Sequence, residues 1–197
     1  MKGIQNMRKI AVVFPGIGYT KDRPLLYYSA KYALSCGYDL IHIEFRGIDW
    51  SKEKLKDREF LLQTLDRCLD ITEEALSGLG DMSGDEVVFI SKSIGTVAAT
   101  AYAGKKGIKA RHICFSPLVF IENFIEEEGG ILFYGDADPL ADHQAIERIA
   151  EEKKLASYRI EGGNHSLETG DVFTDMDNLR KMISLASDAI SPNSSYN

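Results

Sequence analysis

The chain has 197 residues, of which 44% are hydrophobic and 27% charged, so it can bury the core of one domain and is too apolar to be disordered. Its net charge of -7 argues against nucleic acid or an anionic membrane as the main partner. The polar N-terminus offers no signal peptide, and no stretch is apolar enough to span a membrane. We therefore expect a cytoplasmic protein.

We expect a single domain over residues 1–197, with a polar arm at 1–8 and a frayed tail at 191–197. The three cysteines are odd in number and scattered among apolar residues, at Cys36, Cys68 and Cys114. This pattern fits small buried side chains better than a disulfide framework or a metal site. We expect no metal and no other cofactor.

The first half of the chain begins with a continuous apolar run at residues 9–14, which predicts a buried strand. Residues 24–35 predict a helix that begins at a proline and is followed by Gly37. Residues 39–46 alternate strictly between polar and apolar, which predicts a half-exposed strand at a sheet edge. Leucines at helical spacing then predict a long helix over residues 53–79.

The second half repeats the alternation of strand and helix. Short strands are predicted at residues 87–90, 111–115, 131–134 and 157–161, and the last of these alternates like an edge strand. An amphipathic helix with Ala145, Ile146, Ile149 and Ala150 on one face follows the third of them, and a closing helix is predicted over 171–190. Too few residues separate the strands at 111 and 131 for an inserted lid domain. Regular alternation implies an α/β fold, a three-layer α/β/α sandwich around a mainly parallel sheet.

One serine lies at the sharpest junction of this pattern. The buried strand at 87–90 ends in small residues around Ser93, and an alanine-rich helix follows at 97–103. Such a turn places the hydroxyl above the sheet edge and directs the amides of the helix N-terminus toward the same point. The hydroxyl could attack there, although a serine in this position could equally be a helix cap.

The segment Ser91-Lys92-Ser93-Ile94-Gly95 resembles the nucleophile elbow, G-x-S-x-G, of the α/β-hydrolase superfamily, with serine in place of the first glycine. The resemblance covers residues 9–190 and implies that fold without its first two strands. It predicts six strands in the spatial order second, first, third, fourth, fifth, sixth. The edges would then be the strands at 39 and 157, which are the two that alternate.

The resemblance also implies a catalytic triad in the chain order serine, aspartate, histidine. Ser93 would be the nucleophile, His165 the general base, and Asp138 the residue that orients the imidazole. Asp138 completes the family's G-x-x-D pattern after the strand at 131. Asp136 is the alternative, although it could merely stabilise the turn.

The glycine-containing loop at residues 15–19 resembles the family's His-Gly loop, with Pro15 where histidine is common. The resemblance implies an oxyanion hole formed by the backbone N–H groups of Ile17 and Ile94. Gly16 and Gly18 could instead suggest a dinucleotide fingerprint, but the third glycine is missing.

We therefore expect a small lidless serine hydrolase, an esterase, thioesterase or dienelactone-hydrolase-like enzyme, that cleaves esters or thioesters of small or exposed acyl groups. Four residues could line its pocket by position: Tyr19, Arg46, Trp50 and Phe120. Arg46 could pair with a substrate carboxylate or with a neighbouring acid such as Asp49. The alternative is a non-catalytic small-molecule-binding protein on the same scaffold.

Overall fold

The computed structural model describes residues 7–48 and 58–192. Most of the expected N-terminal arm, most of the expected tail and Trp50 lie outside these ranges. The sheet contains six parallel strands in the order β2-β1-β3-β4-β5-β6, as predicted. The strands are β1 (Lys9–Phe14), β2 (Asp39–His42), β3 (Glu86–Lys92), β4 (Ala110–Phe115), β5 (Gly130–Gly135) and β6 (Ala156–Ile160).

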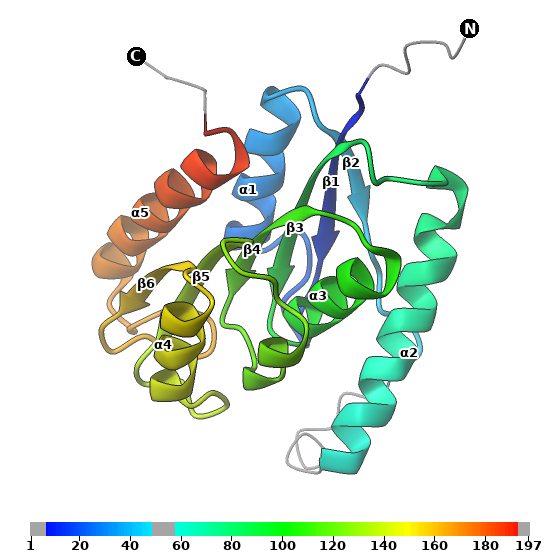
Figure 1. Ribbon diagram of the computed structural model, residues 1–197. Coiled ribbons are helices and arrows are strands. Elements are labelled where there is room, and N and C mark those ends of the chain that lie inside the picture. The colour runs from blue at the N-terminus through cyan, green and yellow to red at the C-terminus, as the bar shows by residue number, and fades with distance from the viewer. Residues whose placement is uncertain (1–6, 49–57, 193–197) are drawn as a thin grey trace, which may run out of the picture.

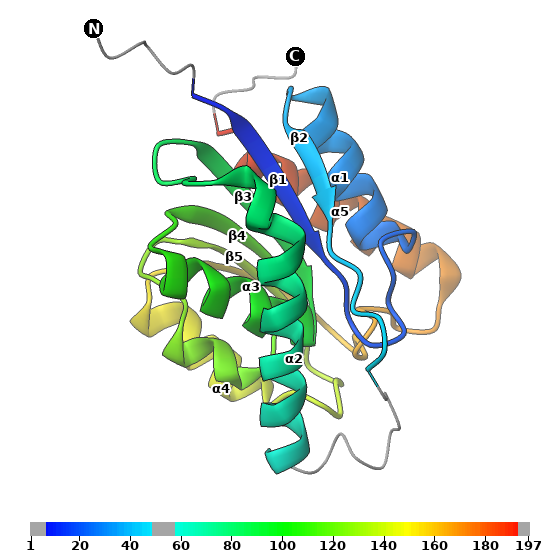
Figure 2. The same ribbon diagram turned by 90° about the vertical axis from the view of Figure 1, so that its right-hand side faces the viewer.

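Helices cover both faces of the sheet, which gives the predicted three layers (Figures 1 and 2). On one face lie α1 (Pro24–Ser35) and α5 (Val172–Ile190). On the other lie α2 (Arg58–Leu76), α3 (Ile94–Lys106) and α4 (His143–Glu152). None of the helices in the described parts of the chain has the length and apolar character needed to cross a membrane.

The central strand β3 divides its side chains between two apolar cores. Val87 and Phe89 are buried against α2, α3 and α4. Val88 and Ile90 are buried against α1 and α5. Because side chains alternate along a strand, Ser91 continues the first row and Lys92 the second. Two consecutive polar residues therefore enter opposite layers just before Ser93.

No lid domain lies between β4 and β5, as the short connection in the sequence predicted. Residues 116–129, all of which are described, contain one short 3-10 helix, η3 (Val119–Asn123), and loops. The connection between β4 and β5 therefore adds no domain over the carboxyl ends of the strands.

The predicted strand at 39–46 is the element that differs most from the structure. β2 ends at His42, and its register with β1 ends there too. The Ile43 N–H still donates to the Val13 carbonyl at 2.9 Å, but the chain then leaves the sheet. Gly47 turns it with a positive φ of 72°, a conformation that favours glycine. Alternation thus indicated the edge correctly and overestimated the strand's length.

Candidate active site

Ser93 is the single residue between β3 and α3. Its φ of 55° and ψ of -125° lie in a region that side-chain-bearing residues rarely adopt. Two backbone hydrogen bonds hold this conformation: the Ser93 N–H donates to the Phe115 carbonyl at 3.0 Å, and the Thr96 N–H donates to the Ser93 carbonyl at 2.9 Å. The turn therefore holds the Ser93 hydroxyl at the carboxyl end of the sheet.

Small residues allow this turn to pack closely. A Cβ on Gly95 would lie 2.4 Å from the Pro15 carbonyl oxygen and 2.8 Å from that of Phe14. Ser91, at the position where the hydrolase pattern has glycine, is fully buried, and its hydroxyl donates to the Ile113 carbonyl at 3.2 Å. Serine is accommodated here because its one polar atom has a partner.

Three side chains meet at the carboxyl ends of the strands and are linked by hydrogen bonds in a row. His165 Nε2 lies 2.8 Å from Ser93 Oγ, and His165 Nδ1 lies 2.7 Å from Asp138 Oδ2. The second oxygen of Asp138 accepts from the Leu140 N–H at 2.8 Å. A carboxylate can only accept, so Nδ1 carries the proton and Nε2 is left to accept from the Ser93 hydroxyl.

Asp136 has a different role from Asp138. Its Oδ1 accepts from the Gly162 N–H at 2.7 Å, and its Oδ2 lies 3.8 Å from Arg159 Nε. These contacts connect the ends of β5 and β6. The structure thus brings Asp138 to the imidazole and leaves Asp136 stabilising the turn.

Close backbone contacts join the loop after β5, which carries Asp138, to the loop after β6, residues 161–171, which carries His165 and is called the histidine loop below. A Cβ on Gly135 would lie 2.0 Å from the Gly163 carbonyl oxygen, so glycine is required at the start of the G-x-x-D segment. The Asn164 side chain accepts from the Ser166 N–H at 2.7 Å and supports the loop from within. The position of His165 is therefore set by backbone packing as well as by its own ring.

The loop after β1 forms a tight turn beside Ser93. Gly16 and Tyr19 exchange backbone hydrogen bonds of 3.0 and 3.3 Å, and a Cβ on Gly16 would lie 3.1 Å from Ser93 Cβ. Within the described ranges, no acceptor takes the N–H of Ile17 or of Ile94, which begins α3. These are the two groups that the hydrolase resemblance selects for an oxyanion.

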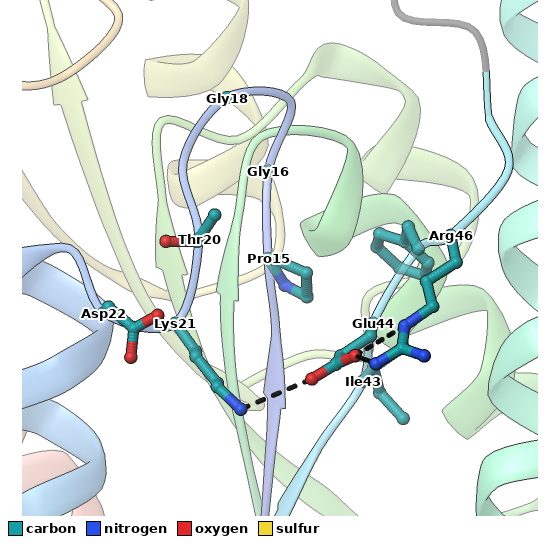
Figure 3. A pocket seen from close by; sticks show the side chains of 10 residues that line it. Pro15, Gly16, Gly18, Thr20, Lys21, Asp22, Ile43, Glu44 and Arg46 are labelled. Atoms are coloured by element: carbon teal, nitrogen blue, oxygen red, sulfur yellow. Dashed lines mark hydrogen bonds and ion pairs between the residues drawn. The ribbon is translucent and has the colours of Figure 1, made fainter.

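A cavity of about 380 Å³ lies between this loop and the chain that follows β2 (Figure 3). Its lining includes Pro15 and Gly16, and Arg46 and Lys21 reach Glu44 from two sides. Arg46 Nε donates to Glu44 at 2.7 Å, and Lys21 Nζ lies 3.4 Å from it. The hydrogen bond from Arg46, and to a smaller extent the one from Lys21, lowers the pKa of Glu44. The described partner of Arg46 is thus Glu44, whereas Asp49 lies outside the described residues.

Two other predicted pocket residues lie away from this cavity. Tyr19 is buried, and its hydroxyl accepts from the Leu25 N–H at 3.2 Å; burial raises its pKa to about 12. It lines a separate groove of about 360 Å³ between the histidine loop and α5. Phe120 lies in η3 and lines a small apolar cleft with Ile94 and Leu65. Trp50 lies outside the described residues.

Lys92 is the residue of the site that the sequence reasoning missed. Its side chain is buried, and Nζ donates to the main-chain carbonyl of His165 at 2.5 Å. The Ser116 hydroxyl donates to the same oxygen at 2.9 Å. The available signal was a lysine two residues after the buried strand predicted at 87–90 and directly before Ser93. In the described ranges, no three His, Cys, Asp or Glu side chains are grouped to hold a metal ion.

We compared the chain with known proteins to identify its fold. No protein-family model matches the chain, and no curated protein matches it in sequence. Solved structures do match. A lidless α/β serine hydrolase from Xanthomonas campestris superposes with a TM-score of 0.65 at 14% identity, over 98% of this chain and 87% of that one.

Two esterases are similar in the same way. The Pyrococcus furiosus esterase Pf2001 has a TM-score of 0.63 at 12% identity, covering 95% of this chain and 84% of its own. Est1E from Butyrivibrio proteoclasticus, solved with ferulic acid bound, has a TM-score of 0.61 at 14% identity, covering 93% and 92%. The chain therefore has the fold of the α/β-hydrolase superfamily, in a form without a lid.

Proposed function

We propose that the protein is a serine hydrolase that cleaves a carboxylic ester or thioester through an acyl-enzyme on Ser93. The observation that carries the proposal is the hydrogen-bonded row of Ser93, His165 and Asp138, with distances of 2.8 and 2.7 Å. This row gives a nucleophile a base within reach, and it gives the base a group that selects its tautomer.

The positions of the protons on the Ser93 hydroxyl and on His165 Nδ1 define the order of the proposed steps. Ser93 Oγ attacks the acyl carbonyl while His165 Nε2 takes its proton, and the imidazolium is stabilised by Asp138. The carbonyl oxygen becomes an oxyanion beside the N–H groups of Ile17 and Ile94. His165 returns the proton to the departing alcohol or thiol. Water activated by the same imidazole then releases the acid and restores Ser93.

Neither Ser93 nor His165 lines the cavity beside the Pro15–Tyr19 loop, but Gly16, which does, packs against Ser93, and we assign the acyl group to this cavity. Its volume of about 380 Å³ is near the lower end of ordinary ligand pockets, roughly 300–1,000 Å³. The segment between β4 and β5 contains one short 3-10 helix and no lid domain that would enclose the acyl group. Both features favour short acyl chains over long buried lipids.

Labelling with a fluorophosphonate, followed by a panel of p-nitrophenyl esters and acyl thioesters, tests the proposal. Wild-type protein should be labelled at Ser93, and Ser93→Ala should lose labelling and turnover. Ser91→Ala is the matched control, because among the described residues the Ser91 hydroxyl hydrogen-bonds only to Ile113 and Cys114 of the neighbouring strand β4. Folded wild-type protein that resists the label and hydrolyses none of the panel would favour the non-catalytic binding module.

A further inference from the structure

Lys92 lies directly before Ser93, and its amino group reaches under the histidine loop. The side chain is only 1% exposed, and Nζ donates to the His165 carbonyl at 2.5 Å. The Ser116 hydroxyl donates to that oxygen at 2.9 Å, so both of its lone pairs have a donor. The residue that carries the imidazole is therefore held through its own backbone.

The same side chain contacts the loop that follows β1. A Cβ on Gly16 would lie 3.1 Å from Lys92 Cγ, so the aliphatic stem packs against that glycine. Lys92 Nζ lies 5.2 Å from the centre of the Tyr19 ring, within the range of a cation–π contact. Lys92 thus contacts the histidine loop and the loop with the Ile17 N–H, and its backbone continues into Ser93.

A lysine in this position costs folding free energy. Burial lowers the pKa of Lys92 to about 7, and the charges of Asp138 and Glu168 oppose that effect. Within the described residues, no carboxylate lies within ion-pair distance of Nζ; Tyr19 and His165 are its other titratable neighbours. An apolar side chain of similar volume would fill the same space at lower cost. The buried amino group therefore points to a task beyond packing.

We propose that Lys92 is a positioning residue of the reaction: its hydrogen bond to the His165 carbonyl holds the imidazole between Ser93 and Asp138. An ammonium and a neutral amine can both donate this bond, so the contact persists through the neutral pH range. The inference rests on the proposed function, because it assigns Lys92 to the same Ser93–His165 pair.

The central variant is Lys92→Met, which keeps the length of the stem and removes the donor. Lys109→Met, at an exposed position before β4, is the matched control. Three readouts are compared: the thermal midpoint, the second-order rate of fluorophosphonate labelling at Ser93, and the ¹⁵N NMR signals of the His165 ring, assigned with His165→Asn. Lys92→Met should fold and label about 10- to 100-fold more slowly, as expected for a base displaced by about 1 Å.

The ring signals distinguish positioning from packing. In wild type they should report a single tautomer with the proton on Nδ1, and in Lys92→Met a mixture of tautomers. Ser116→Ala, which removes the other donor to the same carbonyl, should shift these signals in the same direction by less. Lys109→Met should match wild type in all three readouts.

Wild-type labelling and wild-type ring signals in folded Lys92→Met would overturn the proposal. Where Lys92→Met does not fold, Lys92→Gln is the deciding variant. The glutamine side chain is one atom shorter than lysine, so its amide does not reach the His165 carbonyl. Labelling rates and ring signals equal to those of wild type would then count against a role for that hydrogen bond. Wild-type protein that never labels would refute the proposed hydrolase function alone. The ring signals would still show whether Lys92 holds His165.

Discussion

The two strand ends on either side of the Pro15–Tyr19 loop are built in opposite ways. At the end of β3, Ser93 is 4% exposed, and Gly95 has no room for even one added carbon atom. Beyond the end of β2, the Arg46 side chain is 84% exposed and pairs with Glu44 at the surface. Close packing fixes the reacting groups at the end of β3, whereas residues beyond the end of β2 can be substituted at little cost in folding stability. We expect substitutions at the two ends to affect different kinetic parameters.

The largest expected effect is on the buried side, in Asp138→Asn. An amide can donate to Nδ1, which would leave the ring proton on Nε2 and remove the acceptor for the Ser93 hydroxyl. Turnover should fall about 1,000- to 10,000-fold, as in other triads with this change. The matched control is Asp136→Asn, which keeps an acceptor for the Gly162 N–H. Equal losses in both variants, measured on p-nitrophenyl acetate, would contradict the separate roles of the two aspartates.

The second effect concerns the packing at Gly95. A methyl group there would lie 2.4 Å from the Pro15 carbonyl oxygen, so Gly95→Ala must separate α3 from β1. We expect a loss of about 3 kcal/mol in the free energy of unfolding by urea. Gly104→Ala in the same helix is the control, since its Cβ would come no closer than 4.0 Å to the Phe124 carbonyl oxygen. That variant should gain about 0.5–1 kcal/mol.

The third effect is a change in how stability depends on pH. Lys92 titrates near pH 7 in the folded protein and near 10.4 when unfolded, so the unfolded chain binds more protons between these values. This group therefore makes stability rise with pH in that window, by up to about 1.4 kcal/mol per pH unit. Lys92→Met should lose this rise.

The measurement is the free energy of unfolding of both proteins from pH 7.5 to 8.5. Burial raises the pKa of the Cys68 and Cys114 thiols to about 12, so these thiols contribute an opposite slope from about pH 7.5 upward in both proteins. The difference between the two curves therefore isolates the contribution of Lys92. Parallel curves for wild type and Lys92→Met would show that the buried amine stays protonated in the folded protein, with a pKa above this range, and would contradict the prediction.

The same contrast explains what could be predicted from the sequence. Periodicity predicted the elements and the two edge strands, whereas the strand order and the meeting of Ser93, Asp138 and His165 were predicted from the resemblance to the α/β-hydrolases. The burial of Tyr19 and the Glu44 partner of Arg46 depend on how individual loops turn, and no local pattern encodes that. Lys92 was missed because a lysine is read as exposed unless its tertiary neighbours are known.

The smallest expected effect is on the exposed side, in Glu44→Gln. This change leaves Lys21 and Arg46 without their shared carboxylate at the cavity, so an anionic acyl group should bind better there. The thermal midpoint should not change measurably, because exposed ion pairs contribute little. We expect KM to fall about two- to fivefold for an anionic ester such as p-nitrophenyl hemisuccinate, with kcat and the constants for p-nitrophenyl acetate unchanged. The gain should shrink as salt is added, and Glu152→Gln, at the exposed end of α4, should show none of it. An equal change in KM for both esters would mean that Glu44 shapes the cavity through packing. The buried end of β3 and the exposed segment beyond β2 would then not have separate roles in reaction and in substrate selection.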